Sequence, residues 1–472
     1  MNPAAQLSAS AQIAQSAIAL NTDAHPSLEH YLQQGYAAYT YAYPHKSAYR
    51  RLAEPVALES LWQAESRDDL FLYVHIPFCH YRCGFCNLFA LGAPKPELVT
   101  EFMKALQRQI RITAQALGPH RITRMAIGGG TPSYLDVAQF EELMACLYRH
   151  FNLDAPNRCF GIEVAPDSAT VQRLRSYKNA GVTRISMGVQ SFNDHEMDAL
   201  ARPRQRDEVL QGVEVTRALA FDSLNLDLIY GIQGQTEHSF MSSLDSVLAL
   251  NPEELYLYPL YVRQLTGLAK AARTQGLQQR SGLYAAGSVR LRGAGYTQSS
   301  MRMFRREGRP VNAGQVNDGQ QANAEFACQT LGTIGLGAGA RSYTRGLHYS
   351  EEYATSRGAS QAILQAYNQR TEHEFASARF GFTLDASEQR RRYLLQSLLM
   401  WPGVELKAYQ AYFGSAMMDD FPELAALVER SLAQTNEHYF ALTQTGMALA
   451  DAIGPWLYSQ AVREQTAGYD WR

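Results

Sequence analysis

The sequence predicts an α/β protein built on a parallel sheet of six βα units that close part of the way into a barrel. Short apolar runs rich in β-branched and aromatic residues recur along the chain, and helical patterns separate them. Strands that alternate with helices indicate a parallel sheet with right-handed crossovers. Ligand-binding residues are then expected at the carboxyl ends of the strands. The expected strands are 70–76, 124–128, 159–165, 184–190, 223–230 and 254–262.

Segment 136–151 represents the helices between these strands. Asp136 and Gln139 match a capping box, which predicts that a helix begins there. The apolar residues that follow recur three or four positions apart, so one helical face is apolar. That stripe consists of Val137, Phe140, Leu143, Met144, Leu147 and Phe151.

Three cysteines follow the first expected strand, in the run His75-Ile-Pro-Phe-Cys79-His-Tyr-Arg-Cys83-Gly-Phe-Cys86. Thiolates are soft ligands suited to iron–sulfur clusters or zinc, and a short loop allows all three to converge. A closed zinc site needs four ligands, so His75 or His80 would have to complete it. Three thiolates also fit a [4Fe–4S] cluster with one iron open to another ligand. The motif alone permits both interpretations.

A glycine run ends the second expected strand, in Ile127-Gly-Gly-Gly130-Thr-Pro-Ser133. Glycines let the backbone approach a ligand closely and present bare N–H and C=O groups. The Thr-Pro pair then breaks the strand. Because this run lies one βα unit after the cysteines, it predicts a ligand-binding loop rather than a simple turn.

Taken together, these motifs resemble the radical SAM branch that contains oxygen-independent coproporphyrinogen III oxidase (HemN), the haem chaperone HemW and the haem-degrading enzymes ChuW and HutW. The resemblance runs from about Tyr39 to the C-terminus and includes an N-terminal stretch, Tyr39 to Arg51, like that of operon-encoded HemN-like proteins. It implies a radical SAM partial (βα)6 barrel with a C-terminal helical, winged-helix-like domain. The matching segments are LFLYVHIPFCHYRCGFC, IGGGTPSYL, GIEVAPDS, GVTRISMGVQSFND with the arginine after it, and NLDLIYGIQGQT.

The resemblance also implies the cofactors and the chemistry. Cys79, Cys83 and Cys86 would bind a [4Fe–4S] cluster whose fourth iron is open to S-adenosylmethionine (SAM). The reduced cluster would cleave SAM to a 5′-deoxyadenosyl radical that abstracts a substrate hydrogen, which requires a reducing partner such as flavodoxin. The protein's part is to orient the cofactors and to exclude water and oxygen.

Eight further residues match family positions near SAM. A planar guanidinium suits the methionine carboxylate of SAM, which implies that role for Arg202. The remaining matches are Tyr73 near SAM, Gly129, Gly130 and Thr131 at its amino group, and Glu163, Gln190 and Asp227 as hydrogen-bonding partners. The alternatives are a surface ion pair for Arg202, structural caps for Gln190 and Asp227, and barrel packing for Tyr73.

Two departures bear on the reaction. Coproporphyrinogen oxidases carry another cysteine two residues after the third ligand, where this chain has Leu88, and their second SAM pocket differs from Tyr258-Pro-Leu-Tyr261 and Gln298-Ser-Ser-Met301 here. HemW-type chaperones carry an HNxxYW motif that residues 300–340 lack. We therefore expect an oxidase-like radical SAM enzyme acting on a tetrapyrrole, with a haem-binding chaperone or carrier as the alternative.

The expected organisation has four parts: an N-terminal extension (1–60), the radical SAM core (61–290), a linking region that covers the barrel (291–385) and the C-terminal domain (386–472). Residues 264–350 are rich in Gly, Arg and Gln, and runs such as 315–321 indicate loop. From Glu388 to Met400 the pattern turns helical and stops at Trp401-Pro-Gly403. A short strand and turn at 439–446 lie among the later helices.

Composition indicates a cytoplasmic protein. The net charge of −2 and pI near 6.6 give no electrostatic case for nucleic acid. Residues 1–24 lack the basic cluster and apolar run of a signal peptide, and no apolar stretch is long enough for a membrane span. Six cysteines in 472 residues form no disulfide framework, and Cys146, Cys159 and Cys328 are expected to fill core space.

The arginine-rich segment from Arg290 to Arg309 is the expected contact for the substrate. Guanidiniums would bind propionates, while aromatic and methionine side chains would cover the faces of a flat ring. The alternative is a solvated loop without a specific role. The residues concerned are Arg290, Arg292, Arg302, Arg305, Arg306 and Arg309, with Tyr296, Met301, Met303 and Phe304 among them.

Overall fold

The computed structural model describes residues 27–153, 159–263, 265–270, 276–306 and 332–471. A 13-stranded sheet, in the order β1-β15-β14-β13-β12-β2-β5-β6-β7-β8-β9-β11-β10, forms its framework. The middle of this sheet is a series of parallel strands in chain order, which confirms the predicted βα core. They are β2 (Leu70–Ile76), β5 (Ile122–Gly129), β6 (Cys159–Val164), β7 (Arg184–Gln190), β8 (Ser223–Tyr230) and β9 (Glu254–Pro259).

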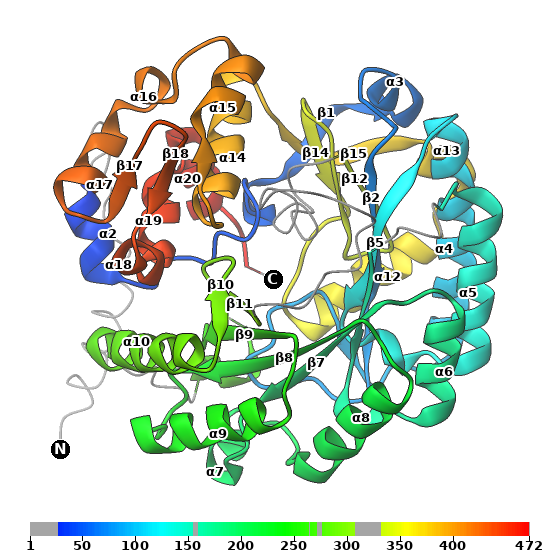
Figure 1. Cartoon of the computed structure of the whole chain (residues 1–472). Coiled ribbons are helices and arrows are strands. Elements are labelled where there is room, and N and C mark those ends of the chain that lie inside the picture. The colour runs from blue at the N-terminus through cyan, green and yellow to red at the C-terminus, as the bar shows by residue number, and fades with distance from the viewer. Residues whose placement is uncertain (1–26, 154–158, 264, 271–275, 307–331, 472) are drawn as a thin grey trace, which may run out of the picture.

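Helices cover the outer face of the curved sheet (Figure 1). In α5, Asp136 and Gln139 form the predicted capping box, and Phe140, Leu143 and Leu147 of the predicted stripe are buried against the sheet. The helices between or after the parallel strands are α4 (Pro96–Leu117), α5 (Val137–His150), α6 (Val171–Asn179), α7 (Asp194–Ala199), α8 (Arg206–Ala218), α9 (Glu237–Ala249) and α10 (Leu277–Gly293). Single-turn helices η3 (Pro132–Tyr134), η4 (Pro166–Ser168) and η5 (Gly267–Lys270) lie in the loops.

The described parts of 264–350 differ from the expected loop, because short strands there extend both edges of the sheet. β12 pairs in parallel with β2, and the β10–β11 hairpin adds to β9. These strands have only three to five residues each, so their pairing with existing edges, rather than their own sequence pattern, makes them strands. Residues 315–321 and Cys328 lie outside the described residues. The added strands are β10 (Tyr296–Gln298), β11 (Met303–Arg306), β12 (Gly332–Leu336), β13 (Arg341–Tyr343) and β14 (Leu347–Ser350).

The outermost strands join the N-terminal part of the chain to the segment before the C-terminal domain. β1 (Arg50–Ala57) pairs antiparallel with β15 (Ser377–Thr383), which in turn pairs with β14. The sheet therefore combines residues from the expected extension, core and linking region. The helices beside these strands are α3 (Leu58–Gln63), α12 (Arg357–Asn368) and α13 (Glu372–Phe375).

The C-terminal part is winged-helix-like, with helices around a three-stranded sheet in the order β16-β18-β17. The predicted helix is α14 (Ala386–Leu398), followed by Trp401-Pro-Gly403 and β16 (Val404–Glu405). The rest consists of α15 (Leu406–Phe413), α16 (Met417–Asp420), η6 (Pro422–Leu424), α17 (Ala425–Glu429), β17 (Ala433–Thr435), β18 (Tyr439–Leu442), α18 (Gln444–Ala448), α19 (Ala450–Trp456) and α20 (Gln460–Ala467).

The N-terminal segment 36–49 lies between the barrel and the C-terminal domain. It connects α2 (Leu28–Gln34), which packs on α19, to η2 (Lys46–Ala48) and β1. The Tyr43 hydroxyl donates to Glu388 Oε2 at 2.6 Å, so α14 holds this segment in place. Figure 1 shows the N-terminal chain, in blue, beside the C-terminal helices in orange and red. Among the described helices, none is both long and apolar enough to cross a membrane.

Candidate functional site

The cysteine loop leaves the carboxyl end of β2 and is tied down on both sides. Cys79 ends the short strand β3 (Phe78–Cys79), which pairs with β4 (Leu91–Gly92). At the far side, the Gly84 N–H donates to Leu200 O and the Gly84 carbonyl accepts from the Leu268 N–H. The Cys86 N–H closes the turn onto Cys83 O at 3.1 Å. The backbone therefore holds all three cysteines over the same end of the barrel.

Burial favours the protonated form of the Cys79 and Cys86 thiols, because it raises the pKa of both. Burial raises the pKa of Cys79 to about 12, and the nearby Cys86 and Cys83 sulfurs raise it further. Burial also raises the pKa of Cys86. Binding of iron would reverse these shifts, since a metal stabilises the thiolate form.

The surroundings favour a cluster on three cysteines over the zinc alternative. In the described part of the chain, no three His, Cys, Asp or Glu side chains converge closely enough for one metal ion. Both ring nitrogens of His75 are engaged, by Phe89 O at 2.8 Å and the Tyr73 hydroxyl at 3.2 Å, and the His80 ring packs on Tyr134. Each cysteine of a [4Fe–4S] cluster binds a different iron, so three cysteines suffice and need not meet at a point.

The glycine run packs directly against the cysteine loop. A Cβ atom on Gly130 would come within 2.7 Å of Phe78 O and 2.9 Å of Cys79 Sγ. Gly129 has a φ of +123°, a backbone conformation that residues other than glycine rarely adopt. The Thr131 N–H donates to Phe78 O at 2.8 Å, and the Thr131 hydroxyl points at Cys79 Sγ. The predicted Gly129, Gly130 and Thr131 thus adjoin the cysteines.

Glu163 and Tyr73 meet over the same run. Glu163 Oε2 accepts a hydrogen bond from the Gly129 N–H at 3.2 Å, and a Cβ on Gly128 would lie 2.9 Å from Glu163 Oε1 and 3.1 Å from the Tyr73 hydroxyl. Burial, followed by the charge of Asp227, raises the pKa of Glu163 to about 7. The side chain is nevertheless accessible to water. Its exposed surface therefore faces the enclosed interior of the barrel rather than bulk solvent.

Arg202 connects the cysteine loop to β7. Its Nη1 donates to Cys83 Sγ at 3.3 Å and its Nη2 donates to Gly188 O at 2.8 Å. Its buried Nε has no hydrogen-bond partner among the described residues. These contacts exclude the surface ion pair that the sequence left open. A guanidinium with a free donor beside the thiols fits the carboxylate of SAM.

Gln190 is aimed by an irregularity in its strand. The pairing of β7 with β8 shifts register between Gly188 and Gln190, and Gln190 has a φ of +71°. Residues other than glycine rarely adopt this backbone conformation. Where they do, the residue often belongs to a functional site. The bulge brings the Gln190 amide over Gly188, the residue whose carbonyl accepts from Arg202.

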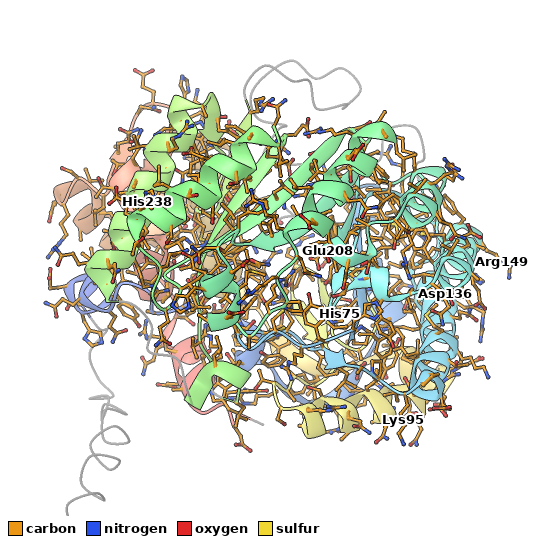
Figure 2. All side chains as sticks on the ribbon, turned by 90° about the horizontal axis from the view of Figure 1, so that it is seen from below. His75, Lys95, Asp136, Arg149, Glu208 and His238 are labelled. Atoms are coloured by element: carbon orange, nitrogen blue, oxygen red, sulfur yellow. The ribbon has the colours of Figure 1, made fainter. Side chains whose placement is uncertain are left out.

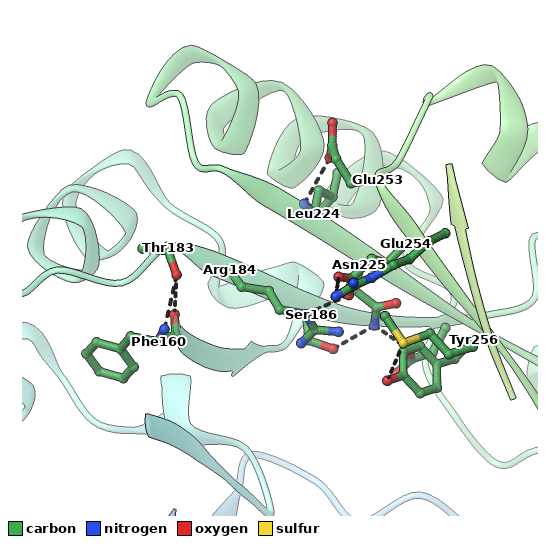
Figure 3. Close-up of polar contacts among 12 residues, drawn as sticks. Phe160, Thr183, Arg184, Ser186, Leu224, Asn225, Glu253, Glu254 and Tyr256 are labelled. Atoms are coloured by element: carbon green, nitrogen blue, oxygen red, sulfur yellow. Dashed lines mark hydrogen bonds and ion pairs between the residues drawn. The ribbon is translucent and has the colours of Figure 1, made fainter. Parts of the chain in front are cut away.

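Asp227 belongs to a polar network along β7, β8 and β9. Figure 3 labels Arg184, Ser186, Asn225 and Glu254 of this network. Asn225 Nδ2 donates to Asp227 Oδ1 at 2.7 Å and to Ser186 Oγ at 2.8 Å, while Arg184 pairs with Glu254 at 2.7 Å. Burial raises the pKa of Asp227 to about 6. Asn225 was missed from the sequence, although its alternation with Leu224 and Leu226 was a visible signal.

The predicted site residues therefore lie together, at the carboxyl ends of β2, β5, β6, β7 and β8. Along β7 partly accessible and buried residues alternate strictly, and on β8 and β9 Asp227, Tyr256 and Tyr258 are partly accessible. In Figure 2, His75 lies toward the centre of the molecule, while Lys95 and Arg149 lie at its edge. The donor set consists of soft thiols, one free guanidinium donor and two partner-poor carboxylates, and it fits a cluster with SAM.

The arginine-rich segment differs from its expected role. Arg302 is buried and pairs with Asp451, Arg305 pairs with Glu254 at 3.2 Å, and Arg290 pairs with Asp245 at 2.8 Å. Arg309 lies outside the described residues. The side chains expected to cover a ring are buried in the protein core instead, and the described residues 290–306 form the end of α10 and the β10–β11 hairpin rather than a solvated loop. The buried side chains are Tyr296, Met301, Met303 and Phe304.

Comparisons with known proteins agree with this fold. The family model described as "Radical SAM superfamily" matches residues 73–247. The oxygen-independent coproporphyrinogen III oxidase of Salmonella typhimurium is 29% identical over 434 residues, covering 87% of this chain and 91% of that protein. The haem chaperone HemW of Bacillus subtilis is 26% identical over 387 residues, covering 81% and 97%. The solved structure of Escherichia coli coproporphyrinogen III oxidase (HemN) aligns with a TM-score of 0.75 at 25% identity, covering 89% and 96%.

The fold and the cysteine loop define a radical SAM protein. The chain belongs to the radical SAM superfamily and is similar to both HemN and HemW. Membership implies a [4Fe–4S] cluster and SAM. The two kinds of relative differ in what they do, so the reaction does not follow from the family alone.

Proposed function

We propose that the protein is an enzyme that reductively cleaves SAM at a [4Fe–4S] cluster and abstracts a hydrogen atom from a tetrapyrrole. The observation that carries the proposal is the contact of the cysteine loop with the Gly129–Gly130–Thr131 run, with Arg202 on the third side. A cluster and a ligand bound to its open iron would both be held at this one place.

Each part of the site has a separate role. Cys79, Cys83 and Cys86 would bind three irons, and the free Nε of Arg202 would donate to the methionine carboxylate of SAM. Glu163 and Asp227 would accept hydrogen bonds from the SAM ammonium or ribose. Partnering these carboxylates would offset the cost of burying them, which their raised pKa values reflect.

A cluster held by Cys79, Cys83 and Cys86, together with SAM, would supply the electron transfer and the hydrogen-abstraction chemistry. The electron would come from a reducing partner such as flavodoxin. The protein would work in the cytoplasm, where thiols stay reduced. Its own contribution is to orient SAM and to keep water and oxygen out.

The first test is SAM cleavage by the reconstituted protein. Anaerobic reconstitution is expected to load about four irons per chain, and dithionite with SAM should yield 5′-deoxyadenosine. Cys83→Ala should lose both properties, because it removes one ligand and the sulfur that Arg202 contacts. Cys146→Ala is the matched control, since Cys146 is a partly buried cysteine of α5 away from the loop. Stoichiometric zinc in the native protein, or a full cluster in Cys83→Ala, would refute the proposal.

The tetrapyrrole part rests on similarity to HemN and HemW, and the departures limit which tetrapyrrole reaction is proposed. Leu88, where the oxidases have a cysteine, is 42% exposed. Tyr258 and Tyr261, in a segment unlike the oxidases, both pack against Tyr39. We therefore propose oxidase-like hydrogen abstraction without assigning a double propionate decarboxylation.

The second candidate is a haem carrier of the HemW type, supported by the 97% coverage of that relative. The absent HNxxYW motif favours the enzyme. We expect a tetrapyrrole to accelerate SAM cleavage and to be altered itself, as judged by mass spectrometry of the recovered pigment. Micromolar haem binding, with the haem unchanged and SAM cleavage unaffected by it, would instead assign the carrier function.

A further inference from the structure

Two basic side chains, Lys46, which is buried, and Arg341, which is half-buried, lie beside the cysteine loop, and each rests on tyrosine rings. Lys46, at the start of η2, is 9% exposed, and its Nζ lies 3.5 Å from the centre of the Tyr353 ring. The guanidinium of Arg341, at the start of β13, lies 4.8 Å from the Tyr41 ring and 5.7 Å from the Tyr343 ring. Cation–π contacts stabilise such groups, but they replace only part of the lost hydration.

Neither cation has a carboxylate partner among the described residues, whose ion pairs include neither of them. Arg341 Nη1 is buried without a hydrogen bond. Three other enclosed arginines have carboxylate partners, since Arg302 pairs with Asp451, Arg184 with Glu254 and Arg370 with Glu351. Arg280, which also lacks a carboxylate and rests on the Tyr36 ring, donates instead to Leu260 O at 2.9 Å. Burying an uncompensated charge is costly, and a lysine beside an arginine adds repulsion. Such an arrangement points to an anion that binds from outside the chain.

The two cations adjoin the proposed reaction site. The Tyr353 hydroxyl under Lys46 donates to Asn87 O at 2.6 Å, next to Cys86. Arg341 is close enough to Tyr73, the residue over Gly128, to interact with it electrostatically. Both cations also lower the pKa of His75, which burial brings to about 4, so this histidine adds no positive charge. Arg263, 5.7 Å from the Tyr261 ring, supplies a further cation nearby.

These cations are distinct from the group that serves SAM. Arg202 contacts Cys83 and β7, whereas Lys46 and Arg341 come from the N-terminal segment and from β13 at the other side of β2. Lys46 and Arg341 both contact aromatic rings, and Lys46 also lies close enough to Cys86 to interact with its sulfur electrostatically. Flat tyrosine faces beside paired cations suit a flat apolar ring that carries carboxylates.

We propose that Lys46 and Arg341 bind a carboxylate of the substrate and so hold its ring beside the cluster. This inference rests on the proposed function and identifies the group of the substrate that is recognised. It also replaces the arginine-rich segment as the contact for a propionate, since Arg290, Arg302 and Arg305 of that segment are already paired with carboxylates.

The test uses a pair of probes that differ only in their charge: mesoporphyrin IX and its dimethyl ester. Binding of each is measured by absorbance on the reconstituted protein with SAM and without reductant. The wild type is expected to bind the diacid about tenfold or more tightly than the ester, since hydrogen bonds to charged groups are strong. Lys46→Met and Arg341→Gln should lose that preference, whereas Lys46→Arg should retain most of it. Lys95→Met, an exposed lysine, and Arg290→Gln, an exposed ion-paired arginine, are the matched controls.

SAM affinity, iron content, cluster reduction potential and melting temperature are measured on the same samples. The proposal is supported if Lys46→Met and Arg341→Gln lose the preference for the diacid over the ester while these four values stay unchanged. Variants that keep the preference overturn it while leaving the tetrapyrrole substrate in place, as do variants that change only SAM affinity or the cluster potential. If the wild type binds neither probe, the proposed tetrapyrrole substrate and the proposed carboxylate contact are both refuted. The SAM-cleavage part of the proposed function is tested separately, by the yield of 5′-deoxyadenosine. Should Lys46→Met fail to fold, Arg341→Gln decides.

Discussion

Replacing Gly130 by alanine is expected to prevent cluster assembly and to reduce SAM cleavage by about a hundredfold or more, since a displacement of about 1 Å at a reaction site has effects of this size. The added Cβ would lie 2.7 Å from Phe78 O, 2.9 Å from Cys79 Sγ and 3.0 Å from Phe78 N. Two of these are backbone atoms of the strand that positions the first cysteine, so relief of the clash must move that cysteine. Iron content, the cluster absorbance and the yield of 5′-deoxyadenosine measure the effect.

Gly282→Ala is the matched control, because a Cβ on Gly282 meets nothing within 4 Å. That residue lies in α10, where alanine is the better helix former, so the control should fold at least as well as the wild type. Full iron content and normal SAM cleavage in Gly130→Ala would show that the two loops do not touch as described. They would also remove the observation on which the proposed function rests.

The parallel core could be predicted because its signals are local. Each strand carries apolar residues in a short run or at every second position, and Asp136 with Gln139 marks the start of α5 through contacts within four positions. The position of the candidate site could also be predicted, from the order of the strands. Strand ends in a parallel barrel meet at one edge, so Cys79, Glu163 and Asp227 had to approach one another once the strand order was known.

The sheet extensions were not predictable in this way, because pairing rather than pattern forms them. Gly332–Leu336 is a glycine-rich run that becomes a strand by lying along Leu70–Val74, more than 250 positions earlier in the chain. Lys46 and Arg341 likewise come together only because the N-terminal segment returns to the barrel and is held there by α14. A charge cluster read along the sequence therefore misplaced the substrate contact at Arg290–Arg309. There the sequence could not reveal the partner carboxylates Asp245, Glu254 and Asp451.

Replacing Arg302 by alanine is expected to lower the free energy of unfolding by about 3–5 kcal/mol, the usual cost of breaking a buried ion pair. Arg302 is 2% exposed and Asp451 is 1% exposed, so the substitution leaves an uncompensated carboxylate inside the protein. Arg302 also donates to the Tyr261 hydroxyl at 3.1 Å and lies 5.3 Å from the Tyr39 ring. Because it lies at the turn before β11 and Asp451 lies in α19, the pair joins the barrel to the C-terminal domain. Urea denaturation at constant m measures the loss.

Two controls separate this structural role from the substrate role that the sequence predicted. Arg302→Met combined with Asp451→Leu should recover most of the lost stability, since removing both charges leaves no buried ion without a partner. Arg290→Ala, which breaks an exposed pair, should change stability by less than about 1 kcal/mol. The opposite result would be Arg302→Ala with unchanged stability and weakened porphyrin binding. That outcome would indicate that Arg302 binds a carboxylate of the porphyrin, as the sequence predicted. The ion pair between Arg302 and Asp451 would then not be needed for stability.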